Sequence, residues 1–335
     1  MSRYSIILPV RNGGEYVKEC VGSILAQSIP DFRLQVLDNC SSDGTREWIE
    51  SLNDARISIH PAEKPLTIEE NWSRITGIQK NEYMTMIGHD DILFPNYLKS
   101  MDDLIRRHPK ATLYQTHFSY IDSKGDIIRN CKPMDEVQSA GEFLSFFLAN
   151  LIDTMGTGFL MRAKDYDSCG GIPPRYPNLL FADFELYINL TRMGYKATSF
   201  EPGFSFRLHQ SMTTTSPDLK FHDAFSVFID YLYSLKNSDE AFQIIIKRYA
   251  LDFLNLYCKG LSHRLLRTPM NKRKGKTVSY FISLTKEYAD KLVPDNDFDP
   301  EKLFSIKVAK QIDNNPISRS MFLFFKKIRT KPVLS

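Results

Sequence analysis

The spacing of hydrophobic residues changes near the start of the chain, and this change predicts a strand followed by a helix. Residues 5–10 form a short apolar run that ends at the turn formed by residues 12–14, as in a buried strand. Within residues 15–25, apolar positions recur at helical spacing. A second apolar run, residues 34–37, predicts another strand, and Asp38 follows it directly.

A strand–helix–strand order of this kind predicts an α/β protein with an open sheet. Ligands bind such sheets beyond the carboxyl ends of the strands, where the first two strand-to-helix loops meet. A carboxylate there can accept the imide N–H of a uracil or thymine ring, so we expect Asp38 to face a nucleotide base. Asp43 precedes Gly44-Thr45 and a helical stretch, and its position fits either a ligand site or a helix cap.

A second candidate motif follows the predicted strand 83–87. Gly88 and His89 interrupt that strand, and the adjacent acids Asp90 and Asp91 come next. Two neighbouring carboxylates at the end of a buried strand repel each other and lose hydration, which a divalent cation or a bound polyol can offset. Mg²⁺ or Mn²⁺ held by carboxylates and diphosphate oxygens is the usual arrangement in phosphate chemistry. The alternative is a helix N-terminus decorated with acids, and the position after a strand favours the ligand site.

Composition limits the class of protein. A chain of 335 residues has room for one large domain, or for one domain and an appendage. The formal net charge of +3 gives no argument for nucleic acid as a partner. The five cysteines are scattered without Cys-x-x-Cys spacing, which suits a reducing cytosol and speaks against a zinc site. No apolar run approaches the ~20 residues that span a bilayer, and the N-terminal run is too short for a signal peptide, so we expect a cytoplasmic protein.

Several segments, in this order, resemble the family-two inverting glycosyltransferases with the GT-A fold. These segments are residues 6–12, 23–28, 36–45, 89–91, 182–186 and 206–209. The resemblance covers approximately residues 4–215. It implies a Rossmann-like mixed sheet flanked by helices, a nucleotide-sugar donor, Mn²⁺ or Mg²⁺ as cofactor, and inversion at the anomeric carbon.

The resemblance also assigns roles to individual positions. Nucleotide-binding roles fall to Pro9, Arg11, Asp38, Asn71, Arg74 and Asp90. Among these, Asp38 would read the base and Asp90 would face the ribose or the metal. Asp91 would ligate the metal, together with His209. Arg207 would lie on the diphosphate side, and Gly156 on the acceptor side.

Asp183 is the expected catalytic base. An acceptor hydroxyl is a poor nucleophile, so a carboxylate must take its proton as the new bond forms. Asp183 opens a predicted helix that ends near Gly194, and helix capping is the alternative role for an Asp in that place. We favour the catalytic role.

The chain departs from the family pattern at two positions. The family commonly has an acid two residues before Asp90, where this chain has Gly88, and a Glu before the catalytic Asp, where it has Ala182. The first departure bears on metal coordination, and the second on the positioning of the acceptor.

Beyond residue 215 the chain reads as helices, which are predicted over residues 223–233, 240–266 and 277–292. We therefore predict a helical C-terminal region over residues 216–335. The segment 318–331 combines aromatic and basic residues. It suits either the anionic face of a membrane, where lipid-linked acceptors reside, or an amphipathic helix that closes the core or joins two copies into a homo-oligomer.

The predicted catalytic domain spans residues 1–215, with a nucleotide half over about 1–95 and an acceptor half over about 96–215. We expect a metal-dependent transferase of the hexosyltransferase type, which moves a sugar from a UDP- or dTDP-sugar to a hydroxyl of a glycan or lipid-linked oligosaccharide. It would be cytoplasmic, free or peripheral on the cytoplasmic membrane face. The alternative is a non-catalytic nucleotide-sugar-binding subunit of a glycan assembly complex, which Gly88 and Ala182 support.

A phosphohydrolase that forms an aspartyl-phosphate is excluded. The Asp43-Gly44-Thr45 sequence after a strand suggests it, but the nucleophilic Asp belongs two positions before Asp43, and Ser41 stands there.

Overall fold

The computed structural model describes residues 2–208 and 219–328. These residues separate into two compact units. The first contains the described residues up to 208 except residues 148–150, which group with the second unit. The predicted domain boundary at residue 215 lies outside the described residues.

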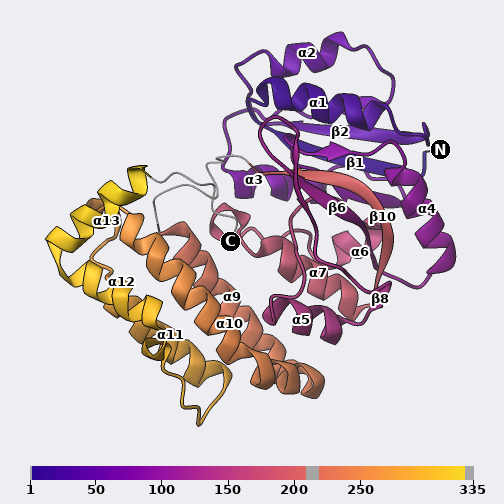
Figure 1. Ribbon diagram of the computed structural model, residues 1–335. Coiled ribbons are helices and arrows are strands. Elements are labelled where there is room, and N and C mark those ends of the chain that lie inside the picture. The colour runs from indigo at the N-terminus through magenta and orange to yellow at the C-terminus, as the bar shows by residue number, and fades with distance from the viewer. Residues whose placement is uncertain (1, 209–218, 329–335) are drawn as a thin grey trace. The chain divides into compact units, whose positions relative to one another are not determined.

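The described part of the first unit is built on a mixed sheet of ten strands (Figure 1). The strands are β1 (Tyr4–Val10), β2 (Phe32–Asp38), β3 (Ile57–Ile59), β4 (Tyr83–Met86), β5 (Ile92–Leu93), β6 (Leu113–Ile121), β7 (Ile127–Asn130), β8 (Val137–Gln138), β9 (Phe159–Arg162) and β10 (Lys196–Arg207). The sheet order is β3-β2-β1-β4-β9-β6-β10-β5, with β7 paired to β6 and β8 to β10. Strands β1 to β4 are parallel, and β9 is antiparallel to both of its neighbours.

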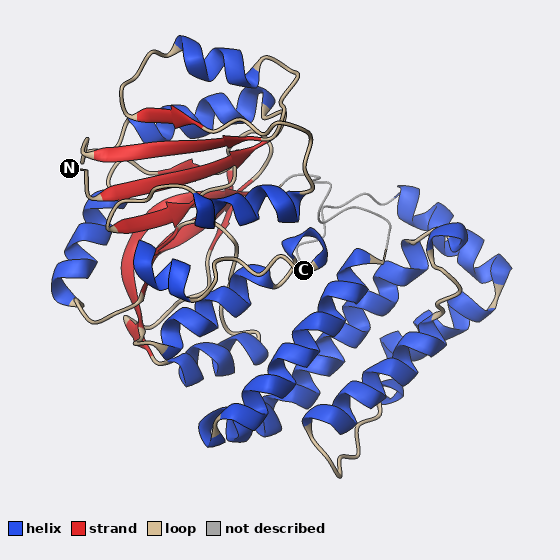
Figure 2. Ribbon diagram, turned by 180° about the vertical axis from the view of Figure 1, so that it is seen from behind, coloured by secondary structure: helices blue, strands red, loops and turns tan. Residues whose placement is uncertain are grey.

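Helices cover both faces of this sheet (Figure 2). They are α1 (Gly14–Leu25), α2 (Thr45–Ser51), α3 (Ile68–Ser73), α4 (Tyr97–Arg107), α5 (Ala140–Leu148), α6 (Ala163–Ser168) and α7 (Ala182–Arg192), with the 3-10 turns η1 (Arg74–Gly77) and η2 (Pro177–Leu179). Helix α1 buries Val17, Cys20, Val21 and Ile24, the positions whose helical spacing predicts it. The predicted mixed sheet flanked by helices is confirmed.

The second unit is helical in its described part, as predicted. Its helices are α9 (Lys220–Ser238), α10 (Glu240–Arg267), α11 (Val278–Leu292), α12 (Phe304–Asn314) and α13 (Pro316–Ile328), with the 3-10 turns η3 (Met270–Lys272) and η4 (Pro300–Lys302). Helix α10 packs against α9, α11 and α12. Aromatic side chains such as Phe225, Phe228 and Phe253 fill the core between them. Burial of these large rings explains why the helices associate.

None of the helices in residues 2–208 and 219–328 has both the length and the apolar character needed to cross a bilayer.

Candidate active site

Most of the predicted site residues gather where the parallel strands β1, β2 and β4 end. Val10 and Asp38 are register partners at the ends of β1 and β2, and the 88–91 loop follows β4. Pro9 is buried within β1, whereas Arg11 is exposed just beyond the end of that strand. The carboxyl edge of the sheet is therefore the place where these side chains meet, as the topology requires.

The loop after β1 and the loop after β2 are bound to each other. The backbone N–H of Gly13 donates to Thr45 Oγ1 over 3.0 Å. The Asp43 carboxylate accepts from the backbone N–H of Gly14 at 3.0 Å and of Thr45 at 3.1 Å. Burial acts to raise the pKa of Asp43, but the hydrogen bonds from Thr45 and Gly14 lower it below its usual value. Asp43 therefore holds the two loops together and also accepts from Thr45, the first residue of α2.

Asp38 is almost fully buried, and hydrogen bonds fix the chain segments around it. Its carboxylate accepts from the backbone N–H of Ser41 at 3.3 Å. The neighbouring Asn39 side chain bonds both backbone groups of Leu66, at 2.7 Å to the N–H and 2.9 Å to the carbonyl. This pair of bonds fixes the segment before α3 next to the end of β2.

The structure brings Asn71 and Arg74 to the same place. The Arg74 guanidinium donates to Asn71 Oδ1 at 2.8 Å, to the Asp38 carbonyl at 3.3 Å and to the His60 carbonyl at 2.6 Å. Asn71 in turn donates to the Leu37 carbonyl at 3.3 Å. These two side chains therefore hold the chain around Asp38, and a direct contact with diphosphate stays a prediction.

The acids Asp90 and Asp91 converge beside Gly88. An ideal Cβ built on Gly88 would lie 2.8 Å from Asp91 Oδ2 and 2.9 Å from Asp90 Oδ1. Asp91 is buried, and its Oδ1 accepts from the backbone N–H of Arg207 at 2.9 Å. Burial, followed by the nearby charge of Asp90, raises the pKa of Asp91 well above its usual value.

Gly88, where the family commonly has an acid, leaves room beside the two carboxylates that follow it. Any larger residue there would place its Cβ less than 3 Å from an oxygen of each acid, so both carboxylates would have to shift. Glycine leaves open the space on which Asp90 and Asp91 converge.

Arg207 lies at the end of β10 and fixes the same loop. Its side chain is 1% exposed, and its Nη2 pairs with Glu19 of α1 at 2.5 Å. The guanidinium also donates to the carbonyls of Asp90 at 2.8 Å and Asp122 at 3.1 Å, and it lies 4.6 Å from the centre of the Tyr16 ring. These contacts join α1, the acid loop and the turn after β6, so Arg207 positions Asp90 and Asp91.

Asp183 lies in the first turn of α7 and is partly exposed. Its Oδ1 accepts from the backbone N–H of Phe184 at 2.9 Å. An ideal Cβ on Gly156 would lie 3.8 Å from Asp183 Oδ2, so the backbone passes close to this carboxylate. Burial raises the pKa of Asp183 to about 6. A carboxylate in such surroundings is a stronger base than an ordinary aspartate.

Residues 155–157 connect Asp183 with the acid pair. Tyr187, one turn after Asp183, donates its hydroxyl to the Met155 carbonyl at 3.2 Å. Two residues later, Thr157 Oγ1 accepts from the backbone N–H of Gly88 at 3.0 Å. Asp183 and the loop that carries the two acids therefore contact neighbouring residues of the same short segment, 155–157.

Two acids, Asp90 and Asp91, converge beside Gly88. Among the described residues, no group of three or more His, Cys, Asp or Glu side chains is placed to hold a metal ion. The predicted ligand His209 lies outside the described residues. From this chain's described part, Asp90 and Asp91 are the groups that could hold a divalent cation.

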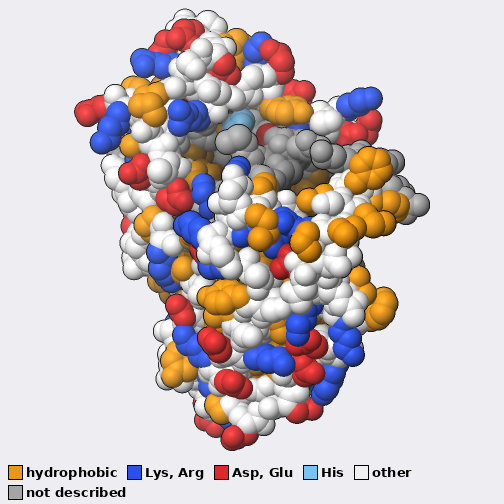
Figure 3. All heavy atoms as spheres, turned by 90° about the vertical axis from the view of Figure 1, so that its left-hand side faces the viewer, with side chains coloured by type: hydrophobic (Ala, Val, Ile, Leu, Met, Phe, Trp, Pro, Cys, Tyr) orange, Lys and Arg blue, Asp and Glu red, His pale blue; other side chains and the backbone are white. Residues whose placement is uncertain are grey.

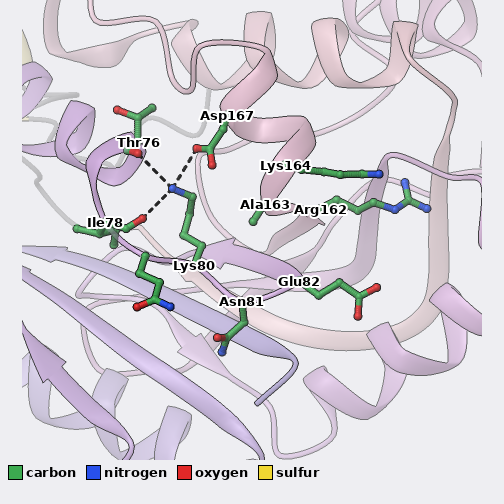
Figure 4. A pocket seen from close by; sticks show the side chains of 10 residues that line it. Thr76, Ile78, Lys80, Asn81, Glu82, Arg162, Ala163, Lys164 and Asp167 are labelled. Atoms are coloured by element: carbon green, nitrogen blue, oxygen red, sulfur yellow. Dashed lines mark hydrogen bonds and ion pairs between the residues drawn. The ribbon is translucent and has the colours of Figure 1, made fainter. Parts of the chain in front are cut away.

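A cavity of about 590 Å³ lies at the opposite end of β4 and β9 (Figure 4). Its most buried cation, Lys80, donates to the carbonyls of Ile75 at 2.9 Å and Ile78 at 3.0 Å and pairs with Asp167 at 3.0 Å. The charge of Lys80 is thus already bound by protein groups. None of the predicted site residues lines this cavity, so it is separate from the candidate site.

Three residues that support the site are not among the predicted site residues. Thr157 bonds the acid loop, Glu19 pairs with Arg207, and Asn39 tethers the segment before α3. Thr157 and Glu19 are each about seventy or more positions from the residue that they hold, and neither belongs to a recognisable motif.

Comparison with known proteins identifies the family. Residues 5–169 match the model of Glycosyl transferase family 2. The uncharacterized glycosyltransferase RC0461 of Rickettsia conorii is 29% identical over 194 residues, which cover 56% of this chain and 31% of that protein. The putative teichuronic acid biosynthesis glycosyltransferase TuaG of Bacillus subtilis is 25% identical over 202 residues, 58% of this chain and 73% of TuaG. Residues 5–169 therefore belong to glycosyl transferase family 2, and the match to the Rickettsia relative spans about a third of that protein's length.

A solved structure gives the same fold. The structure of residues 1–349 of TarS from S. aureus in complex with UDP-GlcNAc matches with a TM-score of 0.62 at 12% identity. The match covers 92% of this chain and 91% of TarS 1–349. The GT-A fold predicted for this chain is confirmed.

Proposed function

We propose that this protein is an inverting glycosyltransferase that moves a sugar from a nucleoside diphosphate to a hydroxyl of a glycan or lipid-linked oligosaccharide. The arrangement around residues 155–157 carries the proposal, because one short segment holds both a basic carboxylate and a pair of acids. Family membership and the fold shared with TarS, which was solved with UDP-GlcNAc, support it. The assignment of TuaG to teichuronic acid biosynthesis supports a polysaccharide as the acceptor class.

Asp183 acts as the general base in this proposal. With a pKa of about 6, it is mostly ionised at neutral pH and still accepts a proton more readily than an ordinary aspartate. Partial exposure lets an acceptor hydroxyl approach it. Because the base takes a proton and forms no bond to the sugar, the acceptor oxygen displaces the diphosphate in one step and the anomeric centre inverts.

Asp90 and Asp91 are the residues that would hold Mn²⁺ or Mg²⁺. Their oxygens are ligands of the kind these cations prefer, and they converge on the space that Gly88 leaves open. A bound cation would offset the negative charge that develops on the departing diphosphate. Arg207 holds this pair in place through the Asp90 carbonyl and Asp91 Oδ1.

Asp38 reads the base of the donor. A buried carboxylate at the end of β2 offers an acceptor for the imide N–H of uracil or thymine, and Arg74 and Asn71 keep the surrounding chain in place. We therefore propose UDP- or dTDP-sugars as donors. A nucleotide-sugar donor and scattered free cysteines fit a cytoplasmic location.

The test combines calorimetry with turnover. UDP, dTDP and GDP are titrated into the protein with and without Mn²⁺, for the wild type, Asp38→Ala and the control Asp31→Ala, which changes an exposed aspartate before β2. We expect metal-dependent binding that favours the uridine or thymidine form, loss of that preference in Asp38→Ala, and no change in Asp31→Ala.

Asp183→Asn separates catalysis from binding. This variant should bind the donor as tightly as the wild type while hydrolysis or transfer of the sugar falls by about a hundredfold or more. Absence of any nucleotide binding by the wild type would contradict the proposed donor site. Unchanged turnover in Asp183→Asn would leave the donor site standing and remove Asp183 as the base.

A further inference from the structure

Helix α13 presents a row of apolar side chains to solvent. Ile317, Met321, Phe324 and Phe325 are spaced by four, three and one residues, which places them on one face of the helix. They are 73%, 67%, 68% and 53% exposed, respectively. We call these four residues the apolar face of α13. Their exposure shows that these four side chains do not pack in the core.

Basic groups accompany this face. Helix α13 contains Lys326 and Lys327 and no acidic residue, whereas the guanidinium of its Arg319 donates to the Thr268 carbonyl at 2.8 Å. On α10, burial and then the charges of Lys326, Lys259 and Arg267 lower the pKa of His263, so each of these cations acts on the same point of α10. In Figure 3, which views the side where α13 lies, hydrophobic side chains gather together with lysine and arginine side chains.

We propose that the apolar face of α13 and the cations beside it dock this protein on a membrane that contains anionic lipid. Aromatic and aliphatic side chains on one face of a short helix enter the boundary between headgroups and acyl chains, and flanking cations bind the negative surface. Phe324 and Phe325 are the aromatic side chains of this face, and Lys326 follows them directly in the sequence.

Charge distinguishes this occupant from a second copy of the chain. In a two-fold symmetric dimer the same patch meets itself, so Lys326 and its neighbours would face cations of the same kind. Like charges brought together in this way oppose association. Because α13 carries no acid, the face offers nothing to neutralise them, whereas an anionic lipid surface does.

Membrane docking does not depend on the proposed transfer reaction, but it would concentrate the protein where lipid-linked acceptors are found. The two proposals can therefore fail separately.

The experiment is co-sedimentation of the full chain with vesicles. Vesicles of phosphatidylcholine alone are compared with vesicles that also contain phosphatidylglycerol. Wild-type protein should partition onto the anionic vesicles, with affinity that falls as salt rises. Phe324→Ser combined with Phe325→Ser, and separately Lys326→Glu, should weaken that binding by about tenfold. The control Phe200→Ser changes an aromatic side chain of the first unit that is 59% exposed, and it should bind as the wild type does.

The circular dichroism spectrum of each variant, compared with that of the wild type, tests whether the variant is still folded. Three results would overturn the proposal: no partition of the wild type, partition that is equal on both kinds of vesicle, or variants that bind like the wild type. A fourth is a wild-type dimer, measured by light scattering, that Phe324→Ser with Phe325→Ser converts to a monomer. That outcome would assign the face to a second copy.

Discussion

Asp183 and Asp91 are both carboxyl groups whose pKa is raised, but their neighbours suit them to different tasks. Asp91 lies against Asp90 and accepts from the Arg207 backbone, so it belongs to a pair of like charges. For Asp183 burial is the cause that raises the pKa to about 6. Two carboxyl groups whose surroundings set their pKa values by different causes can take different chemical roles. The pair suits cation binding and Asp183 suits proton transfer.

The pH dependence of turnover follows from Asp183. The base must be ionised to accept the acceptor proton, so kcat/KM should rise with pH through about 6 and level off above 7. Initial rates between about pH 5 and pH 8, with donor and metal saturating, measure this profile. A profile that stays flat through pH 6 would contradict the assignment of Asp183 as the base.

Stability changes in the opposite direction at the same residue. A carboxyl group whose pKa is higher in the folded than in the unfolded protein stabilises the fold when protonated, and this contribution is lost as pH rises from about 4 through 6. Asp183→Asn keeps a neutral side chain, so its melting temperature should exceed that of the wild type at pH 7 and approach it at pH 4. If Asp183 were only a helix cap, the melting temperature of Asp183→Asn at pH 7 should lie below that of the wild type, because a charged carboxylate stabilises a helix N-terminus.

At the scale of elements, three segments determine the shape of the acid loop. The loop follows β4, its Gly88 N–H is bound by Thr157 just before β9, and Arg207 at the end of β10 holds both acids. The space for a cation therefore depends on backbone positions from different parts of the sheet.

Gly88→Ala tests this arrangement. The added Cβ would lie within 3 Å of an oxygen of each acid, so the two carboxylates must move apart. We expect Mn²⁺-dependent UDP binding to weaken by about tenfold while metal-independent binding is unchanged. The control Gly22→Ala adds a Cβ in α1 that meets no atom within 4 Å, and it should leave binding unchanged. Equal metal-dependent binding by Gly88→Ala and the wild type would show that Asp90 and Asp91 do not share a cation there.

The elements that the sequence predicts are those with regular apolar spacing. Strands β1 and β2, helix α1 and the long helices α10 and α11 all carry such a pattern and form where expected. Strand β6 was not predicted, because it buries the polar residues Gln115, Thr116 and Ser119 among its apolar ones. Strand β10 contains Pro202 and shifts register there, which removes the alternation that would mark a strand.

The candidate site shows the same division. Asp38, Asp90 and Asp91 follow apolar runs, and parallel strands bring their carboxyl ends to one edge, so their proximity follows from the order of the motifs. The contacts of Thr157 and Glu19 depend on the packing of distant segments, which no local pattern records. For the same reason the sequence could not show that Arg207 is bound on several sides by protein groups.

At the scale of the whole molecule, each of the two compact units contains buried hydrophobic residues of its own. Both tryptophans of the chain, Trp48 and Trp72, belong to the first unit. In the second unit, Arg273 pairs with Asp313 at 2.5 Å, with side chains that are 1% and 2% exposed. Tryptophan fluorescence thus follows the first unit, whereas helical circular dichroism is dominated by the helices of both.

Asp313→Ala should separate the unfolding of the two units. The substitution leaves Arg273 buried without its partner and removes the acceptor of the Val278 backbone N–H, a loss of about 3–5 kcal/mol for a buried pair. We expect a lower melting temperature for the circular dichroism transition that fluorescence does not report, and an unchanged melting temperature by fluorescence. Added UDP should raise the fluorescence transition and leave the transition of the second unit unchanged. Asp297→Ala, which breaks a 3.7 Å surface pair with Lys302, should change neither signal. If both signals instead fall together in Asp313→Ala, the two units unfold as one cooperative body.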